Sequence, residues 1–175
     1  MAAIDFETAL ARLLRDGSLR DAFAKDPILL AKQIGVRDID FQTLVSLAPA
    51  DLEFQANVLL HKRYDEIRRV LPVTCRRLGN GAWPSFKEYG RSHWPQHVPV
   101  ALCDARAFCG FLRVTNPAAL CRSEENRIVF AGSDKRFSLS LVPDLPRRQK
   151  SYFGIQLFLR SRTRGWREVA ICFCL

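Results

Sequence analysis

The sequence of residues 136–142 reads RFSLSLV, and that of residues 155–159 reads IQLFL. Both place apolar side chains at every second position, the period of a strand with one buried face. Upstream, apolar residues recur at helical spacing, as in Leu52, Leu59, Leu60, Ile67 and Leu71. The period changes near Ser123. This predicts an α+β protein, with a helical bundle over residues 1–115 and a small, mainly antiparallel sheet over residues 123–175 that packs on the helices.

Capping residues, prolines and glycines set the expected element boundaries. We expect helices over residues 5–15, 19–24, 27–34, 38–47, 50–78, 83–89 and 99–113, the longest of them kinked or divided at Pro72. We expect strands over residues 127–131, 136–142, 153–160 and 166–173, joined as a meander. Residues 132–134 and 164–165 are the expected hairpin turns, and residues 143–150 an exposed basic loop.

The net charge of +9 is unevenly distributed. Residues 1–60 carry six Lys/Arg and nine Asp/Glu, whereas residues 61–99 carry eight and three, and residues 100–175 carry thirteen and six. A basic surface that begins at Lys62 and continues into the sheet favours an acidic partner. The sequence has no apolar run of membrane-spanning length and no secretory signal at its start. We therefore expect a cytoplasmic location and no membrane partner.

The sequence contains no pattern typical of an active site or a closed metal site. His61, His93 and His97 are not accompanied by the carboxylates or spacing that a metal centre needs. The six cysteines are expected to be reduced thiols, mostly buried. Cys172 and Cys174 share one face of a strand, so packing in the core and binding of a soft metal ion both stay open. With no catalytic carboxylate pair, glycine-rich phosphate loop or nucleophile elbow, we expect a protein that is not an enzyme.

Basic and aromatic residues gather near the expected last hairpin. Arg160, Arg162 and Arg167 surround Trp166, and a second basic group comprises Arg147, Arg148 and Lys150. One interpretation is a surface for single-stranded nucleic acid, on which bases stack against the aromatic ring. The other is a sheet edge to which an extended peptide adds as a further strand while arginines hold its acidic side chains. A solvated charged face is the third, functionally neutral interpretation.

Three stretches carry a resemblance to a known family: residues 13–23 (LLRDGSLRDAF), residues 59–72 (LLHKRYDEIRRVLP) and residues 92–95 (SHWP). They resemble bacterial partner proteins of multinuclear non-haem iron-dependent oxidases, which modify ribosomally made peptides. Some members are labelled putative DNA-binding proteins. The resemblance implies an accessory subunit that docks on the oxidase and presents its precursor peptide, with the iron and its ligands in the oxidase and no cofactor in this chain.

Candidate residues follow from this interpretation. For contact with the peptide or another acidic partner we expect Arg160, Arg162, Trp166 and Arg167. For the interface with the oxidase we expect His61, Lys62, Arg63, Trp83 and Trp94, although large aromatic side chains such as these are usually core anchors. A basic nucleic-acid-binding regulator is the alternative function.

Overall fold

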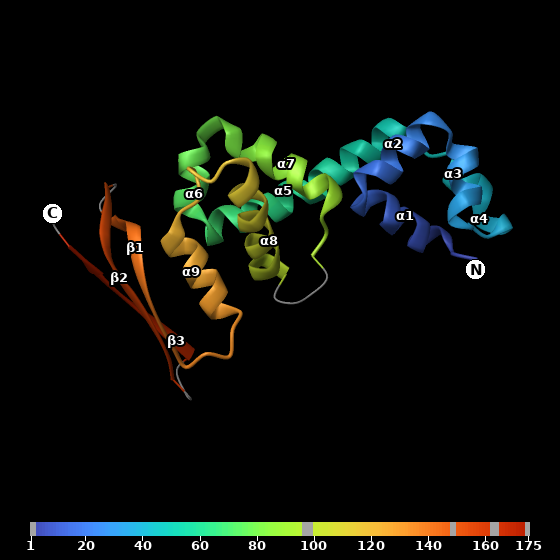
Figure 1. Ribbon diagram of the computed structural model, residues 1–175. Coiled ribbons are helices and arrows are strands. Elements are labelled where there is room, and N and C mark those ends of the chain that lie inside the picture. Colours follow the sequence, from blue (N-terminus) through green and yellow to red (C-terminus); the bar gives the residue numbers. More distant parts are fainter. Residues whose placement is uncertain (1–2, 96–99, 148–149, 162–164, 174–175) are drawn as a thin grey trace. The chain divides into compact units, whose positions relative to one another are not determined.

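A computed structural model describes residues 3–95, 100–147, 150–161 and 165–173. The fold is α+β, as the change of period predicts: helices occupy the chain up to Ala131, and a three-stranded antiparallel sheet follows (Figure 1). The chain forms two compact units, one of residues 1–64 and 84–94, the other of residues 65–83 and 95–175. None of the described helices combines the length and the apolar character that crossing a membrane requires.

The first unit is helical. It holds α1 (Phe6–Arg15), α2 (Gly17–Lys25), α3 (Pro27–Ile34), α4 (Asp38–Val45), the first part of α5 (Pro49–Val70) and most of α7 (Ala82–Ser92). Aspartates begin three of these helices: Asp5, Asp16 and Asp26 each accept a hydrogen bond from a backbone N–H of the first turn. Buried apolar residues from α1 to the first turn of α5 form one cluster: Ala9, Leu13, Phe23, Leu30, Ala31, Ile34, Val36, Leu44 and Leu52.

The run of residues 50–78 is divided at Pro72, as expected. Helix α5 ends at Val70, and α6 (Pro72–Leu78) begins with the proline at its first position. The residue before α6, Leu71, provides no side-chain cap. Glu124 supplies the cap from a distant part of the chain, because its carboxylate accepts hydrogen bonds from the backbone N–H groups of Val73 (2.7 Å) and Thr74 (2.9 Å).

The second unit contains α6, the short 3₁₀ helix η1 (Gly79–Gly81), α8 (Val100–Thr115), α9 (Arg122–Ala131) and the sheet. Helix α9 packs against α8 and against the first two strands. These contacts join helices and sheet in one unit, so the unit boundary falls elsewhere than the expected division between residues 115 and 123.

The prediction of a strand over residues 127–131 is wrong, because these residues form the second half of α9. Glu124 and Glu125 stand in the first turn of this helix, and both side chains are buried together with Ile128 and Phe130. The expected turn at residues 132–134 therefore links a helix to a strand and is not a hairpin.

The sheet is a meander with strand order β1-β2-β3, built from β1 (Phe137–Arg147), β2 (Lys150–Ser161) and β3 (Gly165–Cys172). Both pairs are antiparallel. The expected exposed loop over residues 143–150 is wrong for its described part: β1 continues through it, with a register shift between Val142 and Leu145. Val142 and Leu145 are buried. The expected turn at residues 164–165 falls largely outside the described residues, although Gly165 has the positive φ, 72°, of a turn glycine.

Candidate functional site

Helix α9 covers one face of the sheet (Figure 1). Phe130 on α9 stacks on Phe158 of β2, with ring centroids 5.0 Å apart. Gln156 is fully buried beside them and donates to the backbone oxygen of Ser123 (3.0 Å). Arg127 on α9 forms an ion pair with Glu168 of β3 (2.7 Å). The covered face is thus fixed to α9 by aromatic packing and by polar contacts.

Glu168 lies in this covered layer at β3. Burial raises the pKa of its carboxyl group, but hydrogen bonds from Arg127 and Gln156 and the charge of Arg127 outweigh that effect, so the pKa lies below its ordinary value. The group therefore stays ionised at neutral pH and is already paired within the chain. Because its carboxylate is ion-paired with Arg127, it lacks the character of a catalytic acid or base.

The opposite face of the sheet, here called the outer face, is apolar and exposed. Odd-numbered residues point to it from β1 up to Leu141, from β2 between Phe153 and Leu159, and from β3. Side chains alternate along a strand, and over these stretches the register pairs odd with odd residues. Its strongly exposed members include Leu141 at 69%, Phe137 at 68%, Leu139 at 63% and Ile171 at 54%. The outer face comprises Phe137, Leu139, Leu141, Phe153, Ile155, Leu157, Leu159, Arg167, Val169, Ile171 and Phe173.

The edge of β3 is open. The hydrogen bond from Phe173 N to the oxygen of Phe153 fixes which residues of β3 bond to β2. In an antiparallel pair the bonded residues alternate, so the odd residues of β3 use their N–H and C=O groups on β2. The groups of Trp166, Glu168, Ala170 and Cys172 consequently point away from β2, and within the described residues no strand lies on that side.

The edge of β1 is less suited to accept a strand. By the same rule the hydrogen bond from Arg160 N to the oxygen of Arg136 directs the backbone groups of Leu139 and Leu141 away from β2. Residue 143 is a proline without an N–H to donate, and it lies within the register shift between Val142 and Leu145. Proline and bulges are the usual means by which proteins close a sheet edge to further pairing. β3 contains neither.

The residues predicted to bind a peptide are not gathered in one place. Arg160 and Trp166 are register partners on the covered face. The Arg160 guanidinium donates to the backbone oxygen of Phe130 (3.1 Å) at the end of α9 and lies over the Phe130 ring, and Trp166 contacts Phe130 and Phe158 edge-on. Arg167 lies on the outer face, opposite Leu159. Arg162 lies outside the described residues.

The residues predicted for the protein interface also divide. Arg63 is buried, donates to the backbone oxygen of His93 (3.0 Å) and lies over the rings of Phe86 and Trp94. Trp94 is half-buried between Arg63 and Arg15, and Trp83 is half-buried. His61 and Lys62 are exposed on α5, with His61 Nδ1 3.0 Å from the backbone oxygen of Asn57. Arg63 and Trp94 therefore pack in the interior of the first unit. Of the five residues predicted for the interface, His61 and Lys62 are the exposed ones.

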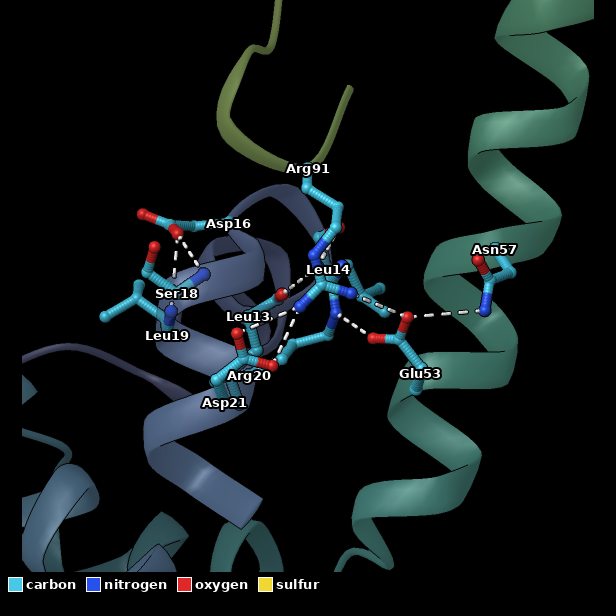
Figure 2. Close-up of polar contacts among 10 residues, drawn as sticks. All are labelled: Leu13, Leu14, Asp16, Ser18, Leu19, Arg20, Asp21, Glu53, Asn57 and Arg91. Atoms are coloured by element: carbon cyan, nitrogen blue, oxygen red, sulfur yellow. Dashed lines mark hydrogen bonds and ion pairs between the residues drawn. The ribbon is translucent and has the colours of Figure 1, made fainter. Parts of the chain in front are cut away.

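Sequence reasoning missed a charged network inside the first unit, drawn in Figure 2. Glu53 on α5 accepts from Arg20 (2.8 Å) and Arg91 (3.1 Å), and Arg91 also pairs with Asp21 (2.8 Å). Arg20 is buried and donates in addition to the backbone oxygen of Leu13 (2.9 Å). Burial raises the pKa of Glu53, but the hydrogen bond and charge of Arg20 lower it further, to a net value below the ordinary one. The network joins α2, α5 and α7 and has the character of a structural tie.

The thiol and carboxylate groups do not form a metal centre within the described part of the chain. Cys109 and Cys121 are buried, and Cys75, Cys103 and Cys172 are partly buried. Burial raises the pKa of Cys109 to about 12, so this thiol is protonated and unreactive. Cys174 lies outside the described residues, so the possible pairing of Cys172 with Cys174 around a metal ion stays an open interpretation.

Comparison with known proteins finds a match in one part of the chain. Residues 46–114 match the family model of the SCO6045-like, C-terminal domain. This range spans α5–α8 and includes two of the three stretches on which the resemblance rests, but neither α9 nor the sheet. No curated protein and no solved structure matches the chain. Over residues 46–114, then, the chain is similar to the SCO6045-like, C-terminal domain family.

Proposed function

We propose that this chain is a non-catalytic partner subunit of a multinuclear iron-dependent oxidase, and that it presents the oxidase's ribosomally made precursor peptide by adding a strand of that peptide to β3. The observation that carries the proposal is the open edge of β3. The backbone N–H and C=O groups of four alternate residues, Trp166, Glu168, Ala170 and Cys172, point away from β2 and pair with no other strand of the described part of the chain. The family resemblance supplies the class of enzyme, and the sheet supplies the means of binding its substrate.

A peptide suits this edge because strand addition reads mainly backbone. Each of these four residues of β3 offers one N–H and one C=O group at the open edge, so an extended peptide segment of about seven residues pairs with all of them. Helix α9 holds β3 in place through the Arg127–Glu168 ion pair, so the accepting strand is ordered before the peptide arrives.

The charge of the sheet favours an acidic peptide. Residues 137–173 contain seven Lys/Arg and two Asp/Glu. Both acidic residues are paired within the chain, Glu168 with Arg127 and Asp144 with Arg77 (2.8 Å). Arg167, exposed at one end of β3, is the described arginine best placed for an acidic side chain of the added strand. Arg160 is engaged with α9, so we assign it a supporting role for the sheet.

Proline substitution on β3 tests the proposal. Ala170→Pro removes an N–H that points away from β2, so the sheet loses no hydrogen bond, but an added strand loses one and meets the proline ring. Leu141→Pro makes the same change on the edge of β1. With a fluorescent synthetic peptide covering the leader of the precursor encoded with the oxidase, Ala170→Pro should weaken binding at least tenfold and Leu141→Pro should not.

Hydrogen exchange adds a second readout. The amides of Glu168 and Ala170 should become protected when the peptide binds, because they would pair with it. Equal peptide affinity of wild type and a folded Ala170→Pro variant would refute strand addition at β3. Binding of a single-stranded oligonucleotide in place of the peptide, with affinity that falls steeply as salt rises, would instead favour the nucleic-acid-binding regulator.

A further inference from the structure

We propose that a pocket between α8 and α9 binds a small oxyanion, a carboxylate or phosphate of about six non-hydrogen atoms. The pocket has a volume of about 150 Å³ and is partly open to solvent. Its lining comes from α8 and α9 alone: Arg106, Cys109, Arg113, Glu125, Ile128 and Val129. The pocket lies within the second unit and takes no residue from the sheet, so its occupancy is independent of the proposed function.

Helical spacing builds this pocket. The lining residues of each helix stand three or four positions apart, which places them on one face of that helix. The two faces meet because α8 and α9 pack against each other. Cys109 and Ile128 are buried and form the floor of the pocket, whereas Arg106 and Arg113 are exposed and stand at its mouth. A ligand that enters therefore meets two guanidinium groups in front of an apolar floor.

The charges at the pocket leave an excess of positive charge. Glu125 is buried, and its two carboxylate oxygens accept from different arginines, one from Arg113 and the other from Arg122 (3.3 Å). Arg106 forms no hydrogen bond or ion pair with any residue of the part of the chain that the structure describes. Three arginines are thus set against one carboxylate, and two of the three line the pocket. An anion would supply the missing partner of Arg106.

Chemistry and size together define the ligand. The forked donors of a guanidinium group match carboxylate and phosphate oxygens, and the bond to Glu125 occupies one nitrogen of Arg113, so its other donors stay available. Burial raises the pKa of Cys109 to about 12, so the thiol at the floor adds no negative charge that would repel an anion. A cavity of about 150 Å³ holds a molecule as large as benzene, which excludes a nucleotide or a folded peptide segment.

Titration with small anions tests the assignment. Butyrate, inorganic phosphate and the neutral analogue butyramide are added to the full chain at constant ionic strength, and NMR follows the backbone amides of α8 and α9. The variants are Arg106→Gln and a matched control, Arg76→Gln, because Arg76 is an exposed arginine of α6 that does not line the pocket. We expect wild type and Arg76→Gln to bind at least one anion with a millimolar dissociation constant, since exposed arginines bind weakly. Arg106→Gln should bind about tenfold more weakly, because it loses a charge-assisted hydrogen bond.

The two anions distinguish the sources of the oxyanion. Tighter binding of butyrate assigns the pocket to a short-chain carboxylate that also contacts Ile128 and Val129, and tighter binding of phosphate assigns it to a phosphate. The proposal is overturned if neither anion shifts the amides of α8 and α9, or if an Arg106→Gln variant that is folded by circular dichroism binds as tightly as wild type. Equal affinity for butyrate and butyramide would also overturn it, because the pocket would then read shape and not charge.

Discussion

Glu124 holds the start of α6 from the start of α9, and its removal should destabilise the second unit. Its side chain is 1% exposed, and its carboxylate accepts three hydrogen bonds, from Val73 N, Thr74 N and the Thr74 hydroxyl group (2.8 Å). The Thr74 hydroxyl oxygen in turn accepts from Cys121 N (3.0 Å), so the contact extends to the residue before α9. No residue next to Leu71 in the sequence replaces this acceptor at the helix start.

The magnitude follows from these bonds. Glu124→Gln keeps the shape but turns an amide NH₂ group toward at least one donor, which removes one charge-assisted hydrogen bond, worth about 1.5–3 kcal/mol, and weakens the others. Glu124→Ala leaves all three donors without an acceptor, at about 3–5 kcal/mol after partial entry of water. For a chain of this length, each kcal/mol lowers the melting temperature by about 2–4 °C.

Urea unfolding followed by circular dichroism measures both variants, and hydrogen exchange of the α6 amides locates the change. Glu66→Gln is the control, because Glu66 pairs with Arg69 on the exposed surface of α5 and should cost less than about 0.5 kcal/mol. If Glu124→Gln costs no more than this control, the carboxylate does not cap α6 in solution and the reasoning is refuted.

Two further predictions concern β2 and the charged network. Gly154→Ala should lower the free energy of unfolding by roughly 1–3 kcal/mol or more, because its Cβ would collide with the backbone oxygen of Ile171. Gly110→Ala on α8 meets open space and should raise the free energy of unfolding by about 0.5–1 kcal/mol. Thermal unfolding measures both variants, and equal effects would contradict the packing around Gly154. Since the pKa of Glu53 is lowered in the folded state, its contribution to stability is present above its ordinary value of 4.5 and is lost as pH falls through the lower folded value. The stability advantage of wild type over Glu53→Gln should therefore shrink between pH 6 and pH 3, and a constant difference would count against the network.

The helices that begin with Asp or Pro were predictable from the sequence, because caps and prolines act locally. Helix α9 was not, since Ile128, Val129 and Phe130 favour a strand by composition. The helix is stabilised by the burial of Glu124 and Glu125, which contact α6 and α8. Buried carboxylates cannot be detected from the periodicity of apolar residues. The available signal was the pair of glutamates in the first turn of a helix.

A small antiparallel sheet with a free edge was predictable from the sequence, but the positions of the candidate residues on it were not. The sequence indicated a small basic sheet with an edge for strand addition. It also grouped Arg160, Trp166 and Arg167 by proximity, whereas the pleat separates them onto two faces. Their odd and even positions relative to buried Phe158 contained that information. Arg63 stands at helical spacing from buried Leu60 and Ile67, which predicted its interior position better than its charge predicted exposure.

The sheet distributes its residues in an unusual way for a chain that folds alone. Its covered face combines the buried apolar side chains of Phe158 and Val142 with polar groups, among them Gln156 and Glu168, which bond to α9 or to one another. Many of its large apolar side chains nevertheless lie exposed on the outer face. Burial of apolar surface is the main stabilising term of folding, so this arrangement forgoes stability in the free chain. The Arg127–Glu168 ion pair and the hydrogen bonds of Gln156 fix the covered face to α9 within the chain. The apolar side chains of the outer face would release hydrophobic free energy if a partner covered them, so binding at this face would restore the stability that the free chain forgoes.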